Sequence, residues 1–204
     1  MKKFALLLLI LGLAVTVFAQ SAPKADDKKP AQQAPPKARP VPTEPAQVYH
    51  NQLRNLEREM VEAAEAMPAD KFDFKPDAKN GAFTESRSFK QQIGHVAANN
   101  FFFASGLTGE KLDQTEKDRE NGPASLTDKN ATVKYLKDSF AAAHKALDTI
   151  TKDNMLEPVE LGGGKTPRMS LANIFLWHGF DHYGQMALYL RMNGIVPPAS
   201  RPRQ

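Results

Sequence analysis

Two histidines near the C-terminal end of the chain, His178 and His182, have the spacing of a metal-ligating pair. Side chains four residues apart lie one turn from each other on the same face of an α-helix. Two imidazole nitrogens placed this way can reach one ion at about 2.0–2.1 Å, the distance that zinc and its neighbours prefer. The spacing alone is weak evidence, because chance places one pair among five histidines four apart in about one sequence in ten.

The surroundings of this pair strengthen the interpretation. Both histidines continue an apolar stripe of their helix, so we expect both rings to point into the core. A buried ring nitrogen without a hydrogen-bond partner costs about 1–3 kcal/mol, and one shared cation would satisfy two of them. The stripe consists of Leu171, Ile174 or Phe175, Gln185, Tyr189 and Met192.

A third ligand has to come from another helix, and three histidines remain as candidates. His50 lies at the start of its expected helix, where the backbone frays. His144 adjoins the core pattern of a strongly amphipathic helix, as boundary residues do. His95 lies in the middle of a helix whose other inward residues are mainly phenylalanines, and it is the best candidate.

Four segments with helical periodicity position these side chains, which predicts an all-α four-helix bundle. The second segment is expected to begin near Ser86 or Ser88, either of which can cap a helix, and to end before Gly106. In the fourth, Thr166 and Pro167 are expected to supply a cap and a first-turn proline, and Gly194 a left-handed stop. The expected helices are 45–67, 88–105, 130–151 and 167–193.

The first 46 residues are expected to lie outside the folded domain. Lys2 and Lys3 precede an apolar run, Phe4–Phe18, of about fifteen residues, which is typical of a signal peptide and too short to span a bilayer as a helix. We expect cleavage after Ala19, with an uncleaved membrane anchor as the alternative. Residues 20–46 hold seven prolines among Ala, Lys and Gln, which predicts a disordered linker. The domain is then 47–204, exported to the periplasm or secreted.

The net charge and the cysteine content argue against nucleic-acid binding and exclude disulfide bonds. The net charge is +4, and Lys2, Lys3 and a linker surplus of two positive charges account for all of it. The domain itself is therefore close to neutral, which argues against a nucleic-acid-binding face. Because the chain has no cysteine, neither a disulfide framework nor a lipidated N-terminal cysteine is possible.

The helices and histidines together resemble the DinB-like (damage-inducible) family of four-helix bundles, whose members hold a divalent metal with three histidines. The resemblance covers most of 47–198. It is carried by a capped helix with a mid-helix histidine, a later His-x3-His helix followed by Gly-Gln, and a Pro-bearing aromatic stretch. These read Ser88-Phe89-Lys90-Gln91-Gln92-Ile93-Gly94-His95, His178-Gly179-Phe180-Asp181-His182-Tyr183-Gly184-Gln185 and Phe72-Asp73-Phe74-Lys75-Pro76.

The resemblance implies that His95, His178 and His182 are the ligands of one divalent transition metal. Asn99 and Gln185, each one turn beyond a ligand, are candidates for orienting the ligands by hydrogen bonds. Zinc is the first expectation, with nickel, iron or manganese as other occupants. Family members often have an Arg where this chain has Tyr183, so a substrate contact from that position is in doubt.

Three neutral imidazoles leave a position on the metal open, as catalytic sites do. The resemblance implies transfer or isomerisation chemistry with a low-molecular-weight thiol. Export weakens this implication, because such thiols are mostly cytoplasmic, and a metal-bound hydroxide that acts on some other substrate is the other reaction considered. No catalytic residue beyond the ligands is assigned. The alternative is a non-catalytic metal-binding or stress-related bundle that acts as an interaction module. Its expected homodimer would form through the outer side of the last helix, at Leu176, Tyr183, Met186 and Leu190.

Overall fold

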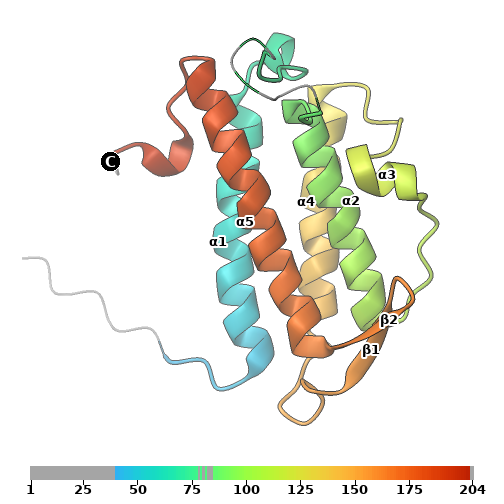
Figure 1. Ribbon diagram of the computed structural model, residues 1–204. Coiled ribbons are helices and arrows are strands. Elements are labelled where there is room, and N and C mark those ends of the chain that lie inside the picture. The colour runs from blue at the N-terminus through green and yellow to red at the C-terminus, as the bar shows by residue number, and fades with distance from the viewer. Residues whose placement is uncertain (1–39, 78, 80, 82–84, 203–204) are drawn as a thin grey trace, which may run out of the picture. The chain divides into compact units, whose positions relative to one another are not determined.

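Four long helices surround the core of the part of the chain that the computed structural model describes, residues 40–77, 79, 81 and 85–202. They are α1 (Pro45–Ala66), α2 (Phe89–Thr108), α4 (Lys129–Leu147) and α5 (Arg168–Met192) (Figure 1). The predicted all-α four-helix bundle is therefore confirmed. The expected signal peptide and all of the expected linker up to Arg39 lie outside the described residues.

The helices pack as a ring, in which α1 and α2 each contact both α4 and α5. The apolar stripes predicted from periodicity supply the core, because each of these helices turns one such stripe inward. Three phenylalanines, each with no exposed surface, come from three different helices: Phe89, Phe140 and Phe175. The remaining long helix, α1, contributes Leu53, Leu56, Met60 and Ala63.

The N-terminal end of α2 agrees with the sequence, and its C-terminal end does not. Ser88 and Gln91 form a reciprocal capping box at the start of the helix. Gly106 does not end α2. Its missing side chain instead makes room for Leu161 and Leu171, since an added Cβ would lie 2.9 Å from a methyl carbon of each. The stop is Gly109, which adopts the left-handed conformation at φ 75°.

Two other predicted boundaries were wrong. The helix expected over 130–151 ends at Leu147, and the residues after it form turns. Thr166 does not cap α5, because it belongs to a two-stranded antiparallel sheet of β1 (Pro158–Leu161) and β2 (Gly164–Pro167). Gly162 and Gly163 have positive φ values of 58° and 82°, which a two-residue hairpin turn requires.

A short helix that the periodicity did not predict, α3 (Glu116–Asn121), lies against α2 (Figure 1). A capping box between Thr115 and Asp118 begins it. Its end touches α2 through two glycines, and a Cβ on Gly94 would lie 2.8 Å from the Asn121 carbonyl oxygen and 3.0 Å from the Gly122 Cα. Backbone therefore meets backbone at this contact.

The expected outer face of α5 was wrong. Leu176, Met186 and Leu190 are buried, and Tyr183 is half-buried, because this side of α5 packs on α1. The contact is close at Gly179, where an added Cβ would lie 2.3 Å from a methyl carbon of Leu56. The apolar side chains that α5 leaves exposed are Trp177, Phe180, Leu188 and Met192.

No helix in the described residues combines the length and the apolar character that crossing a bilayer requires.

Replacing Gly94 by alanine should loosen the contact between α2 and α3, because the new methyl group would collide with backbone atoms that cannot move without shifting α3. We expect a loss of about 1–3 kcal/mol in the free energy of unfolding, measured by urea denaturation. The matched control is Gly184→Ala in α5, where a Cβ meets nothing within 4 Å. That change should stabilise the protein by about 0.5–1 kcal/mol. Equal stabilisation by both alanines would contradict the close contact.

Candidate metal centre

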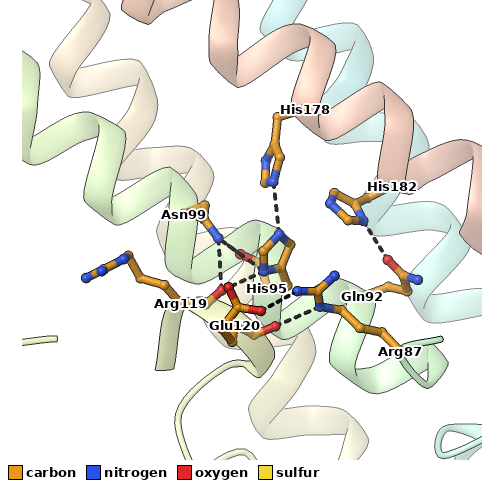
Figure 2. A network of polar contacts seen from close by, with 8 residues as sticks. All are labelled: Arg87, Gln92, His95, Asn99, Arg119, Glu120, His178 and His182. Carbon is orange, nitrogen blue, oxygen red and sulfur yellow. Dashed lines mark hydrogen bonds and ion pairs between the residues drawn. The ribbon is translucent and has the colours of Figure 1, made fainter. Parts of the chain in front are cut away.

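The structure brings His95, His178 and His182 together at the centre of the α2–α5 contact. His95 comes from α2 and the other two rings come from successive turns of α5, as Figure 2 shows. The Nε2 atoms of His95 and His178 are 3.1 Å apart. One ring nitrogen from each of the three residues lies within 4.8 Å of the other two.

His95 is oriented by α3. Its Nδ1–H donates to the backbone carbonyl of Arg119 at 2.6 Å, and a carbonyl oxygen can only accept. The proton of the neutral ring therefore resides on Nδ1, and Nε2 presents a lone pair toward His178 and His182. Asn99 bonds the same carbonyl at 2.9 Å and the His95 carbonyl at 2.8 Å, which holds α3 in place.

His182 is oriented by a chain of amide side chains that begins at a carboxylate. Gln185 donates from Nε2 to Asp181 at 3.3 Å, which turns its own carbonyl oxygen toward Gln92. Gln92 donates to that oxygen at 2.8 Å, so its carbonyl oxygen faces His182 and accepts from Nδ1–H at 2.5 Å. Nε2 of His182 is again left with a lone pair.

The ring of His178 lacks such an orienting bond. Its Nδ1 is buried and has no hydrogen-bond partner among the described residues. The ring is held by aromatic contacts instead, edge-on to Phe103 and to His182. The polar contact of the His178 ring is the one between its Nε2 atom and Nε2 of His95.

Burial keeps all three rings neutral. It lowers the pKa of His178 to about 3, with the neighbouring His182 and His95 adding to the effect. Burial also lowers the pKa of His182 to about 4, and His95 contributes. The pKa of His95 falls for the same reason, helped by the positive charge of Arg87. Neutral imidazoles are the form that binds metals.

An ion pair lies beside the three histidines and joins the start of α2 to α3 (Figure 2). Arg87 donates to the Glu120 carboxylate at 2.8 Å and to the Glu120 backbone carbonyl at 2.7 Å. The carboxylate offsets part of the guanidinium charge, and the remaining positive charge lowers the pKa of all three rings.

The arrangement of the three rings fits one transition-metal ion. Nitrogens bound at about 2.0–2.1 Å around a tetrahedral ion lie about 3.4 Å from each other. The separations are compatible with that value, because one pair is 3.1 Å apart and all three atoms lie within 4.8 Å of one another. Among the described residues, this is the group of three potential ligands whose atoms converge on one point.

The sequence placed the three central histidines together. Of the two residues predicted to orient the ligands by hydrogen bonds, Asn99 contacts His95 directly, with its Nδ2 atom 3.3 Å from Nδ1 and 2.8 Å from the backbone carbonyl oxygen of His95. Gln185 acts one step further away, through Gln92. Gln92 lies three residues before His95 on the same helix face, a spacing that would have identified it. The Arg119 contact uses a backbone atom of an unpredicted helix, so no side-chain pattern marked it. His50 and His144, the other candidates for the third ligand, bond each other elsewhere, between α1 and α4.

Comparison with known proteins identifies the family of the chain. The family model of the DinB superfamily matches residues 52–186, which include all three histidines. The chain belongs to the DinB superfamily. Like other members, it has a helical bundle fold, and the predicted resemblance is confirmed.

Two solved DinB-like proteins share the fold at low sequence identity. The one from Bacillus cereus is 15% identical, with a TM-score of 0.58 over 74% of this chain and 95% of its own. The one from Bacillus subtilis is 18% identical, with a TM-score of 0.55 over 77% of this chain and 99% of its own. None of the curated proteins matches the chain.

The low pKa values predict that the metal-free protein loses stability as the pH falls. An unfolded histidine takes up a proton near pH 6.5, whereas His178 and His182 in the folded state do so only near pH 3 and 4. Between these values the unfolded state binds more protons, so the free energy of unfolding falls as the pH is lowered from about 6.5 toward 4.

The measurement is the thermal midpoint of chelator-treated protein from pH 7.5 to pH 4. His178→Leu should lose less on acidification than the parent protein, although carboxylate protonation affects both. An equal loss in the two proteins would show that His178 is not held neutral by the fold.

Proposed function

We propose that the domain binds one divalent transition metal ion through Nε2 of His95, His178 and His182. The observation that carries the proposal is the tautomer of the ligands, because hydrogen bonds place the protons of His95 and His182 on Nδ1. Their Nε2 lone pairs then lie beside His178, whose Nε2 atom is 3.1 Å from that of His95. Three nitrogen ligands favour zinc first, with nickel, iron and manganese as other occupants.

We also propose that the protein is exported. The support is the N-terminal sequence, in which Lys2 and Lys3 precede the apolar run that ends at the small residues before Gln20. Residues 20–46 would then form a Pro-rich N-terminal segment of the mature protein, or join the domain to a membrane anchor if the signal is retained. The mature protein used in the experiments below accordingly begins at Gln20.

The metal content of protein purified without chelator tests the ligand set. Elemental analysis should give one transition metal ion per chain, and His95→Ala, His178→Ala and His182→Ala should each reduce it to a small fraction. His50→Ala, which removes a histidine of the other cluster, is the matched control and should leave the metal in place. Full occupancy in any of the three alanine variants would remove that residue from the ligand set.

The metal affinity of variants at Gln92 and Gln185 tests whether these residues orient His182. Gln92→Leu removes the bond to His182 and should weaken metal affinity by about 10–100-fold. Gln185→Leu removes only the support of Gln92, so its effect should be smaller. The reverse order would mean that Gln92 does not orient the ligand.

We also propose that the bound metal is catalytic. The support is that three protein ligands leave one coordination position of the metal open to water or substrate. A bound ion of this kind supplies Lewis acidity that lowers the pKa of a water molecule or a thiol. The chain itself supplies a guanidinium, that of Arg87, within electrostatic range of all three histidines. It suits a substrate with an anionic group, whether the reaction is transfer to a thiol or hydrolysis.

A thiol-conjugation assay with zinc-loaded protein separates the enzyme from a protein that only binds metal. If the protein is a transferase, turnover should require metal, and Arg87→Gln should raise KM for an anionic thiol much more than for a neutral one. The reason is that only the anionic thiol gains from the guanidinium charge. Absence of turnover with thiols and with ester substrates would favour the alternative, a non-catalytic bundle.

The alternative function is a metal-binding interaction module that forms a homodimer. The observation that favours it is the exposed apolar surface on α5, where Trp177 is 61% exposed and Leu188 is 50% exposed. This surface replaces the one expected from the sequence, whose residues are buried or half-buried against α1.

A further inference from the structure

The three histidines between α2 and α5 do not reach solvent equally. His182 is buried, with 6% of its surface exposed, whereas His95 and His178 are half-buried. A small molecule that binds at the metal position therefore approaches past His95 and His178. The side chains around these two rings determine what kind of molecule fits there.

The end of the site that lies near the start of α2 is polar and positively charged. Arg87 lies two residues before α2, and its backbone carbonyl accepts a hydrogen bond from Tyr189, near the C-terminal end of α5. Figure 2 shows its side chain on the far side of His95 from His178. A guanidinium at this place attracts the anionic group of a ligand that is bound to the metal.

The surroundings of His178 are aromatic instead. Phe103 of α2 packs edge-on to the His178 ring, with 5.6 Å between the ring centres, and is 8% exposed. Trp177 also packs edge-on to the His178 ring, with 6.1 Å between the centres and 89° between the planes, and is 61% exposed. His178 therefore lies between one buried aromatic ring and one exposed aromatic ring.

Trp177 is the ring at this end of the site that has free surface. Phe102, two turns after His95 on the same face of α2, is covered by the Arg119 guanidinium, which lies 4.6 Å from the ring centre. The indole N–H of Trp177 donates to no group among the described residues. Both the ring and the N–H group of Trp177 are therefore available to a ligand, and covering an aromatic ring of this size contributes strongly to affinity.

We propose that Trp177 forms an apolar wall of the substrate position, and that the substrate carries both an anionic group and an aromatic or other apolar group. The anionic group lies toward Arg87 and the apolar group packs on Trp177, on either side of the atom that is bound to the metal. This inference rests on the proposed metal site, because the ion holds the ligand between the two ends. The competing occupant of Trp177 is a second copy of the chain, and the experiment separates the two.

Two thiols that differ by one phenyl ring test the apolar wall. They are 2-mercaptopropanoate and 2-mercapto-3-phenylpropanoate, which carry the same thiol and the same carboxylate. With cobalt-loaded mature protein, the absorbance of the cobalt–thiolate complex measures how tightly each thiol binds. The phenyl compound should bind about tenfold more tightly, because its ring packs against the indole ring. Equal affinities of the two thiols would overturn the proposal.

Variants at Trp177 identify the side chain that the phenyl ring contacts. Trp177→Ala should abolish the tenfold preference and leave the affinity for 2-mercaptopropanoate nearly unchanged, whereas Trp177→Phe should retain most of the preference. Phe180→Ala is the matched control and should keep it, because Phe180 is an exposed aromatic side chain of α5 that contacts Tyr183 and no histidine. A preference that survives Trp177→Ala would place the phenyl ring elsewhere and would also overturn the proposal.

The fluorescence of the unmodified protein provides a second readout, because Trp177 is the only tryptophan of the chain. Its emission in the zinc-loaded protein should shift to shorter wavelength when 2-mercapto-3-phenylpropanoate binds, and much less with 2-mercaptopropanoate. A shift that follows protein concentration in the absence of any thiol would assign the ring to a contact between two copies of the chain, and the apolar wall would be wrong.

Cobalt binding separates this inference from the proposed function. If the parent protein binds one cobalt ion and both thiols equally well, the metal site stands and the apolar wall fails. If the parent protein binds no cobalt and no zinc, the proposed function fails, and the substrate position beside Trp177 fails with it.

Discussion

The hydrogen bonds that hold protons on Nδ1 of His95 and His182 are the interactions on which the candidate site depends. An imidazole carries its single proton on one nitrogen, so a bond that fixes the proton also fixes where the lone pair points. The acceptors are the Arg119 carbonyl and the Gln92 carbonyl, and both lie behind the rings. Together they direct two lone pairs to one point beside His178, where a cation would accept them.

These acceptors are held in place by parts of the structure that are distant in the sequence. The Arg119 carbonyl reaches His95 because Gly94 and Gly122 let α3 approach the backbone of α2, and because Arg87 bonds Glu120. The Gln92 carbonyl faces His182 because Asp181 fixes the direction of the amide chain through Gln185. The contact between Gly94 and Gly122 therefore supports the tautomer of His95, and the Asp181 carboxylate supports that of His182. The site thus depends on parts of the fold beyond the three ligands themselves.

The sequence predicted the part of this arrangement that depends on regular periodicity. The four long helices and the facing of His95, His178 and His182 follow from apolar stripes and from i, i+4 spacing. The errors arise where a tertiary contact overrides a local signal. Gly106 permits close packing and does not stop α2, and α3 owes its place to a backbone contact that leaves no apolar stripe. The inward and outward sides of α5 were hard to separate, because the helix is apolar around most of its circumference.

Anomalous diffraction from crystals of the zinc-loaded protein is the most direct test of the central claim. We expect one zinc ion per chain between α2 and α5, bound at about 2.0–2.1 Å by Nε2 of His95, His178 and His182. Nδ1 of His95 should keep its hydrogen bond to Arg119, and Nδ1 of His182 its hydrogen bond to Gln92. Zinc bound through an Nδ1 atom, zinc located only at His50 and His144, or no ordered zinc at all would contradict it.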